Sequence, residues 1–291
     1  MAKLAFLGLG VMGYPMAGHL LNKGGHEVTV YNRTAAKSTQ WTEEYGGKSA
    51  PTPREAAGDC DFVLMCVGND DDIRAVVYGA DGALAGMKTG AILVDHTTAS
   101  AIVARELDAA CKERGVGFVD APVSGGEAGA INGQLGIMCG GDEATFAKAK
   151  PVLDLYAKMC TLIGPAGSGQ LTKMVNQIAI AGLLQGLSEA INFGKRAGLD
   201  IEKVIGVISQ GAAQSWQMEN RWKAMNEVKF DGFGFAVDWM RKDLGICLEE
   251  ANTNGARLPA TALIDQFYAQ VQARGGRRWD TSSLMHLLAS D

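Results

Sequence analysis

Residues 3–13, with the sequence KLAFLGLGVMG, decide the fold of this chain. The run begins as a short apolar strand and continues into three glycines with the spacing G-x-G-x-x-G. Residues 12–23 then carry apolar side chains at helical spacing. In a strand, turn and helix of this kind, the glycines allow a tight turn, a close approach of the backbone to a pyrophosphate, and packing of the helix on the strand. We therefore predict a dinucleotide site formed by Gly8, Leu9, Gly10, Val11, Met12 and Gly13.

The end of the second expected strand, 27–31, bears on which dinucleotide binds. An acidic residue at this point would hydrogen-bond the ribose 2′-hydroxyl of NAD, but the chain continues with Asn32, Arg33 and Thr34. Arg33 can pair with a 2′-phosphate through charged hydrogen bonds, to which Asn32 and Thr34 would add neutral ones. These residues favour NADP(H) over NAD(H). If Arg33 is only a solvated loop charge, the preference stays undecided.

The periodicity of the sequence divides the chain into two domains. Strand-like and helical stretches alternate over residues 1–164, which predicts βαβ units and a doubly wound, Rossmann-type α/β sheet. Further strands are expected at 61–66, 91–94, 116–119, 134–139 and 159–163, and helices at 34–45, 70–77, 99–114 and 142–155. Residues 165–291 read as an all-α domain, joined through a long interdomain helix at 168–196 and continuing with helices near 200–209, 214–226, 237–253, 258–274 and 281–289.

Composition excludes several classes of function. The formal net charge of −5, with scattered basic residues, disfavours nucleic acid as a partner. We find neither a membrane-spanning apolar run nor a signal-peptide pattern, so we expect a cytoplasmic protein. The six cysteines lack a C-x-x-C pair and are expected to be buried free thiols, and the four histidines lack ligand spacing. We predict no metal site.

Three further segments carry polar groups suited to chemistry. Residues 120–126, DAPVSGG, follow an expected strand, and Ser124 with the amides of Gly125 and Gly126 could bind a carboxylate. Lys173 lies on the apolar interdomain helix, where a lysine must be paired or lower its pKa, and the second outcome makes an amine usable as an acid or base. The third segment, residues 239–245, contains a Lys-Asp pair. Taken singly, the Ser-Gly-Gly segment could be an ordinary loop, Lys173 could snorkel from a helix end, and the Lys-Asp pair could lie on a solvated helix turn.

Together, the order and spacing of these segments resemble the β-hydroxyacid dehydrogenase family over essentially the whole chain. The family includes 3-hydroxyisobutyrate dehydrogenase, tartronate semialdehyde reductase and the glyoxylate/succinic semialdehyde reductases. The resemblance implies that the D-A-P-V-S-G-G loop holds the substrate carboxylate, that Lys173 is the catalytic acid/base, and that Lys242 lies near the cofactor and substrate. It also suggests Val67, Gly68 and Thr98 for the nicotinamide and ribose side of the cofactor site.

Two features of the chain depart from a single branch of the family. Many members carry asparagine four residues after the lysine, whereas this chain has Gln177 there and Asn176 one residue earlier, as the tartronate semialdehyde branch does. The N-R-T after the second strand instead resembles the NADPH-using glyoxylate/succinic semialdehyde branch. The substrate therefore stays open, as does the choice between Asn176 and Gln177 as the partner of Lys173.

The resemblance implies an enzyme that interconverts a short β-hydroxyacid and its semialdehyde or oxoacid by hydride transfer. Trp239 is a candidate for shaping the substrate pocket, and it would favour short substrates if it faced inward. A homodimer or homotetramer formed through the helical domain is also implied. The alternatives are an imine reductase-like enzyme, which usually lacks the lysine, and a non-catalytic NADPH-binding scaffold, which would need neither the lysine nor the Ser-Gly-Gly loop.

Overall fold

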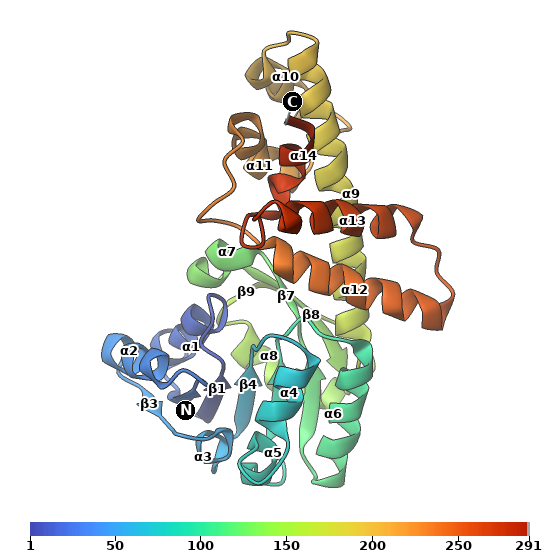
Figure 1. Ribbon diagram of the computed structural model, residues 1–291. Coiled ribbons are helices and arrows are strands. Elements are labelled where there is room, and N and C mark those ends of the chain that lie inside the picture. Colours follow the sequence, from blue (N-terminus) through green and yellow to red (C-terminus); the bar gives the residue numbers. More distant parts are fainter. Residues whose placement is uncertain (290–291) are drawn as a thin grey trace. The chain divides into compact units, whose positions relative to one another are not determined.

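The computed structural model of the protein describes residues 1–289 and divides into two compact units (Figure 1). The sheet unit comprises Met1–Lys173, and the helical unit comprises Met174–Asp291, described as far as Ala289. The division falls within a single long helix, α9 (Ser168–Arg196). The first turn of α9 therefore belongs to the sheet unit and the remainder to the helical unit.

A mixed sheet forms the centre of the sheet unit (Figure 1). Within the described residues it has nine strands in the order β3-β2-β1-β4-β5-β6-β8-β7, with β9 beside β8. Strands β1 to β6 run parallel to one another, and β8 is antiparallel to both β6 and β7. The strands are β1 (Lys3–Leu7), β2 (Glu27–Tyr31), β3 (Lys48–Ser49), β4 (Phe62–Met65), β5 (Ile92–Asp95), β6 (Gly117–Asp120), β7 (Val123–Ser124), β8 (Leu135–Gly141) and β9 (Ala157–Gly164).

Helices cover both faces of this sheet because its strands are apolar on both sides. On β1, Leu4 and Phe6 belong to one buried cluster and Ala5 and Leu7 to another, as alternation along a strand requires. The first cluster packs against α1 (Gly13–Asn22), α2 (Ala35–Tyr45), α7 (Gly126–Asn132) and α8 (Glu143–Leu153). The second packs against α3 (Pro53–Ala57), α4 (Asp70–Val77), α5 (Ala83–Gly86) and α6 (Ala101–Glu113). The unit is therefore a doubly wound α/β fold.

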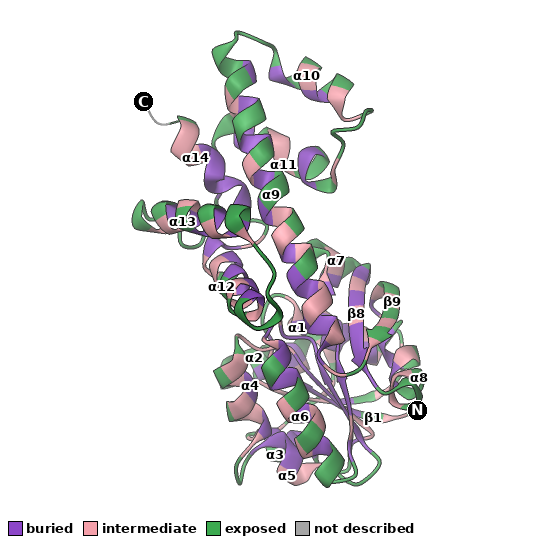
Figure 2. Cartoon of the chain, turned by 90° about the vertical axis from the view of Figure 1, so that its right-hand side faces the viewer, coloured by how far each residue is buried: buried purple, intermediate pink, exposed green. Residues whose placement is uncertain are grey.

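The helical unit packs around its own apolar cluster, to which Leu184 of α9, Leu244 of α12 and Tyr268 of α13 contribute. In Figure 2, buried residues in purple alternate with exposed residues in green along its helices, the pattern of amphipathic helices. After α9 the elements are α10 (Ile201–Ile208), α11 (Trp216–Glu227), α12 (Val237–Asn254), α13 (Pro259–Ala273), the 3₁₀ turn η1 (Thr281–Ser283) and α14 (Leu284–Ala289).

The predicted fold class, a doubly wound sheet followed by helices, is confirmed, and α9 has the bounds that its apolar spacing predicts. Five short elements were not predicted from the sequence: β3, β7, α3, α5 and α7. Two-residue strands and helices of four to seven residues are too short to show a period. The glycines of α7 hide it further, because Gly126 and Gly129 resemble a loop.

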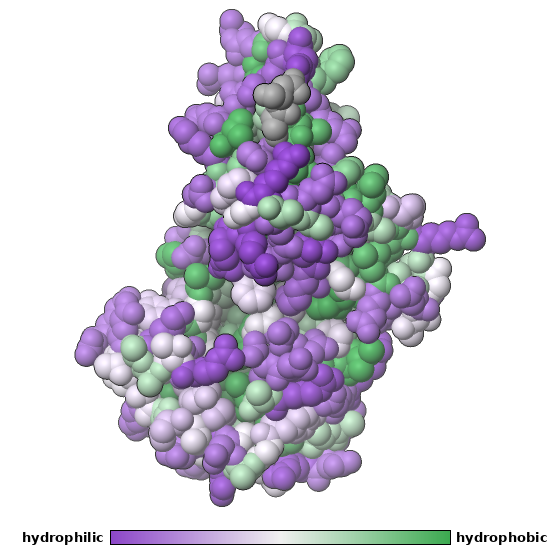
Figure 3. Space-filling view, viewed as in Figure 1, coloured by the Kyte–Doolittle hydropathy of each residue, from purple (hydrophilic) through white to green (hydrophobic). Residues whose placement is uncertain are grey.

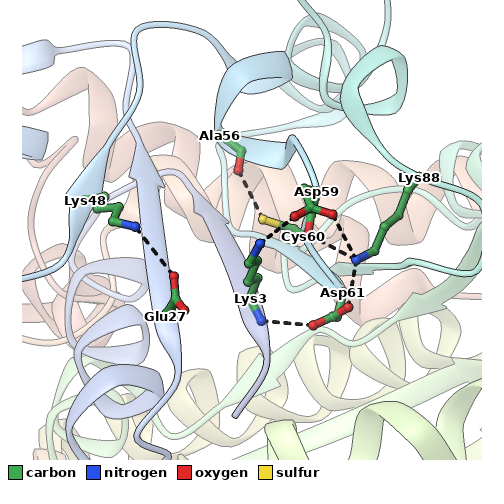
Figure 4. A network of polar contacts seen from close by, with 8 residues as sticks. All are labelled: Lys3, Glu27, Lys48, Ala56, Asp59, Cys60, Asp61 and Lys88. Carbon is green, nitrogen blue, oxygen red and sulfur yellow. Dashed lines mark hydrogen bonds and ion pairs between the residues drawn. The ribbon is translucent and has the colours of Figure 1, made fainter.

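A cluster of charged residues lies at the amino ends of β1 and β4 (Figure 4). Lys3 is 2.5 Å from the carboxylate of Asp59, and Lys88 is 2.9 Å from that of Asp61. Because these side chains are roughly half exposed, water screens their ion pairs and each pair contributes little to stability. The cluster is a solvated ion-pair network at the edge of the sheet opposite the candidate site.

Polar residues, in purple, cover much of the face that Figure 3 shows, with apolar residues in green between them. Within residues 1–289, every helix is too short or too polar to cross a membrane. All six cysteines are free thiols; Cys66 and Cys160 are half-buried and the other four are buried, which largely follows the expectation from the sequence.

Candidate active site

The predicted cofactor loops follow neighbouring parallel strands and therefore meet at the carboxyl edge of the sheet. Residues 8–13 follow β1, residues 32–34 follow β2, residues 67–68 follow β4, and residues 97–99 follow β5. Strand β1 lies between β2 and β4, so the strand order reverses there. Open α/β sheets bind ligands in the crevice outside this switch point.

The glycine loop has the geometry that a dinucleotide requires. Gly8 has a φ of +98°, and a Cβ there would collide with the carbonyl oxygen of Cys66. A Cβ on Gly13 would collide with the carbonyl oxygen of Gly8, which explains how closely α1 packs on the turn. A Cβ on Gly10, by contrast, would meet no atom within 4 Å. The open space over Gly10 fits a pyrophosphate approaching the backbone at the start of α1.

The residues after β2 have different roles from one another. Asn32 accepts a hydrogen bond from the Leu9 amide through Oδ1 (2.9 Å) and donates to the Thr34 carbonyl through Nδ2 (3.1 Å), so it braces the glycine loop. Arg33 is 87% exposed at its side chain, and its Nη1 lies 3.1 Å from Asp72. An ion pair this exposed is weak, so Arg33 can turn to another anion at small cost. Thr34 is the N-cap residue of α2, but its side chain accepts no hydrogen bond from the first turn of that helix.

The loops after β4 and β5 are tied together by Thr97. Its hydroxyl accepts a hydrogen bond from the Val67 amide (3.0 Å), and its own amide donates to Oδ1 of Asp95 (2.9 Å). Val67, Gly68 and Thr98 are half-buried. The residues predicted to line the nicotinamide side therefore belong to two loops whose separation is set by hydrogen bonds.

Asp95 ends β5 as a fully buried carboxyl group whose Oδ2 has no hydrogen-bond partner among the described residues. Burial raises its pKa to about 7, against the opposing effect of the hydrogen bonds from Thr97. The folded state therefore holds the proton more tightly than the unfolded chain does. As the pH rises from about 4 to 7, ionisation of this group therefore lowers the stability of the folded state progressively, and the loss levels off above pH 7.

We expect the stability advantage of Asp95→Asn over the wild type to grow between pH 5 and pH 8, because asparagine cannot ionise. Urea unfolding at the two pH values measures the effect, and a packing penalty of the substitution would appear equally at both. Asp142→Asn is the control that should show no change between these pH values, because hydrogen bonds from Thr145 lower the pKa of that exposed carboxyl and it is ionised throughout this range. An Asp95→Asn advantage that did not change with pH would contradict the assignment.

The predicted substrate loop spans β7 and the start of α7. Ser124 is half-buried at the end of β7, and Gly125 and Gly126 are exposed, with φ values of +128° and +61°. Side chains are disfavoured at both angles, so the two glycines present bare amides beside the serine hydroxyl. Such a group of donors suits a carboxylate.

Lys173 is the last residue of the sheet unit and is 7% exposed. The turn of α9 that carries it is held to the sheet by Asp120 at the end of β6. Oδ1 of Asp120 accepts the Gly167 amide (2.8 Å), and Oδ2 accepts the Gln170 amide (2.9 Å). A carboxylate suits the free N–H groups at the start of a helix. The lysine thus stands at the carboxyl edge of the sheet on a rigidly attached turn.

In the helical unit, four polar residues form one chain of contacts. Asn176 Nδ2 donates to Gln177 Oε1 (2.8 Å), and Gln177 Nε2 donates to Asp243 Oδ2 (2.6 Å). Lys242 Nζ lies 3.0 Å from Asp243 Oδ1. The amide of Gln177 is therefore engaged on both sides and only 2% exposed, whereas Asn176 is half-buried and uses its Nδ2 in this chain.

Trp239, the pocket-shaping candidate, lies in the first turn of α12 and is 39% exposed. The guanidinium of Arg278 lies over its ring, 5.9 Å from the centroid. This contact belongs to the helical unit alone.

Three buried polar residues near the candidate site were not predicted from the sequence: Asp95, Asp120 and Gln170. Asp120 and Gln170 stand inside the quoted motifs, yet only their burial and hydrogen bonds reveal what they do. A carboxylate at the end of a strand is the one signal that the sequence offered for the two aspartates. Among the described residues, no group of three or more His, Cys, Asp or Glu side chains could hold a metal ion.

Comparison with known proteins matches both parts of the chain to family models. The NAD binding domain of 6-phosphogluconate dehydrogenase matches residues 3–164. The NAD-binding domain of NADP-dependent 3-hydroxyisobutyrate dehydrogenase matches residues 167–288. The glycine loop and Lys173 thus lie within regions that match domains of nicotinamide-dependent oxidoreductases.

Individual relatives agree with these matches. The chain is 64% identical to an uncharacterized oxidoreductase of Shewanella frigidimarina over 98% of this chain and 97% of the relative. It is 35% identical to the 2-hydroxy-3-oxopropionate reductase of Escherichia coli over 98% and 97%. The solved structure of Mycobacterium tuberculosis 3-hydroxyisobutyrate dehydrogenase with L-serine has a TM-score of 0.90 and 29% identity, covering 100% of both chains. The chain therefore belongs to the β-hydroxyacid dehydrogenase family of NAD-binding oxidoreductases, which includes 3-hydroxyisobutyrate dehydrogenase.

Proposed function

We propose that the protein is an NADPH-dependent reductase of short aldehydes or oxoacids that carry a carboxylate, with Lys173 as the general acid. The observation that supports this most is a buried lysine on the turn of α9 that Asp120 holds at the carboxyl edge of a dinucleotide-binding sheet. Burial of a lysine is costly unless the lysine is paired or its charge is removed, and buried ionisable groups of this kind are concentrated at functional sites.

NADPH, when bound, would supply the hydride for the carbonyl carbon of the substrate. Lys173, as an ammonium, donates a proton to the carbonyl oxygen during reduction, and as an amine it removes the hydroxyl proton during oxidation. Asn176 is our choice for the partner that orients the lysine or the substrate, because the amide of Gln177 is already engaged with Asp243 and Asn176.

The Ser124 hydroxyl and the amides of Gly125 and Gly126 would hold the substrate carboxylate. Holding the carboxylate fixes the carbonyl in place, which converts binding energy into orientation. The relatives are consistent with substrates of this class, since one is named for 2-hydroxy-3-oxopropionate and another was solved with L-serine, itself a short β-hydroxy carboxylate. We propose the same class for this chain.

The preference for NADPH rests on Arg33, which would pair with the 2′-phosphate. We expect Arg33→Ala to raise the KM for NADPH by roughly 10-fold to 30-fold, as the loss of one or two charged hydrogen bonds to an exposed group implies, and to change the KM for NADH little. Steady-state kinetics with both cofactors measures this. Lys112→Ala, which removes an exposed charge from α6, is the matched control. Equal changes for both cofactors would refute the assignment.

The proposed function is tested by following the loss of reduced cofactor with glyoxylate, succinic semialdehyde, 2-hydroxy-3-oxopropionate (tartronate semialdehyde) and methylmalonate semialdehyde. Rapid turnover of one of them with NADPH is the expected result. Turnover of cyclic imines instead would indicate an imine reductase. NADPH binding without turnover of any substrate would indicate a non-catalytic scaffold.

The homodimer or homotetramer implied by the family resemblance stays a prediction. Apolar side chains on α9 are suited to such an interface, because Val175 is 67% exposed and Phe193 is 74% exposed. A second copy of this chain is the partner that we propose for them.

A further inference from the structure

We infer that Gln170 is a positioning residue that sets the place of Lys173 relative to the loop after β5. This inference rests on the proposed function, because it concerns how the proposed acid is held. The relevant contacts all lie within the sheet unit. They join the first turn of α9 to Thr97 and Ala99, the residues on either side of Thr98.

The side chain of Gln170 is fully buried and uses both ends of its amide. Oε1 accepts a hydrogen bond from the Ala99 amide (3.0 Å), and Nε2 donates to the Thr97 carbonyl (2.7 Å). The loop offers one donor, the Ala99 amide, and one acceptor, the Thr97 carbonyl. Few side chains other than glutamine could bind both with one planar group. Buried polar groups that lose such partners are costly, so the loop and the helix are held in one relative position.

Asp120 completes the attachment from the other side. Its carboxylate accepts the main-chain amides of Gly167 and Gln170, so the backbone of the turn is fixed by β6 while the Gln170 side chain is fixed by the loop after β5. Two attachments to different strands leave the turn little freedom to rotate or slide. A single attachment would leave it free to pivot.

Lys173 lies three residues after Gln170, so the two side chains leave the same side of the helix. Thr98, predicted to line the nicotinamide side, lies between the two residues that Gln170 binds. The side-chain amide of Gln170 therefore sets the spacing between Lys173 and the loop that carries Thr98. Loss of the attachment should lower kcat by about 10²-fold, the typical cost of a misplacement near 1 Å.

Two variants of nearly the same shape test this role. Gln170→Leu cannot make either hydrogen bond and should lose kcat at every pH. Gln170→Glu should restore activity only while its carboxyl is protonated, because the neutral acid can donate to the Thr97 carbonyl and accept from Ala99, whereas the carboxylate repels that carbonyl. The ratio of its kcat to that of the wild type should therefore fall as the pH rises from about 6 to 8.

The measurement is kcat at saturating NADPH across this pH range, with circular dichroism confirming that each variant is folded. Gln40→Glu, on the exposed surface of α2, is the matched control and should show a flat ratio. A flat ratio for folded Gln170→Glu, or wild-type kcat in Gln170→Leu, overturns the inference. If Gln170→Leu does not fold, the pH dependence of Gln170→Glu decides alone.

Failure of this inference is distinguishable from failure of the proposed function. If Lys173→Ala is inactive while both Gln170 variants behave as the wild type, Lys173 remains the acid and Gln170 does not position it. If Lys173→Ala is active, the proposed acid is wrong whatever the Gln170 variants do.

Discussion

Lys173→Ala is expected to lower kcat by about 10³-fold while NADPH still binds, because removal of a general acid costs roughly 10²-fold to 10⁴-fold. The residue is buried on the turn of α9 that Asp120 holds, so truncation removes the amine and leaves the attachment of the turn in place. The dinucleotide loop joins β1 to α1, and none of its residues belongs to this turn. Cofactor affinity should therefore change little.

Stopped-flow and steady-state kinetics measure the loss, and fluorescence titration measures NADPH binding. Lys195→Ala is the matched control, since Lys195 is an exposed lysine of the same helix whose Nζ donates to the Asn226 carbonyl. Small alkylamines added to Lys173→Ala should restore part of the rate by occupying the vacated space. Near-normal kcat in a folded Lys173→Ala protein would end the assignment of Lys173 as the acid.

Gly10→Val is expected to lose NADPH affinity and keep its stability, whereas Gly13→Val is expected to lose stability. At Gly10 an added Cβ would meet no atom within 4 Å, so the fold should survive while the pyrophosphate loses its approach to the backbone. We expect NADPH affinity to fall on the order of 10³-fold, since a steric clash with a bound group is worth several kcal/mol. At Gly13 the added side chain would collide with Gly8 and Phe6, so the protein itself should be destabilised.

Thermal unfolding and NADPH titration of both variants separate the two effects. Gly10→Val should unfold near the wild-type temperature without the NADPH-induced rise in stability that a bound ligand produces. Gly13→Val should unfold at a clearly lower temperature even without NADPH. NADPH binding of wild-type strength by Gly10→Val would show that the space over Gly10 is not the pyrophosphate site.

Local patterns in the sequence were enough to predict most of the fold. Apolar runs such as 3–7 and the helical spacing through 168–196 identify their elements because burial of one strand or helix face depends on residues near one another in the chain. Elements too short to show such a period, such as α7, were not predicted. The glycine spacing likewise predicted a turn whose backbone angles only glycine adopts easily, and Gly8 has such an angle.

The roles of the buried polar residues could be read only from the tertiary structure. Gln170 binds residues 71 and 73 positions away, and Asp120 accepts an amide 50 positions away. Asn32 and Arg33 are adjacent polar residues, yet Asn32 braces the glycine loop and Arg33 is exposed beside Asp72.

By itself, therefore, the sequence determined the doubly wound sheet, the long helix α9 and the family, because those depend on local periodicity and on the spacing of glycines and polar residues. Only the tertiary structure decided which polar groups brace the loops, that the pKa of Asp95 is raised, and that α9 is held to the sheet at two points. The physical reason is that hydrogen-bond partners and burial are set by residues distant in the chain, which no local pattern records.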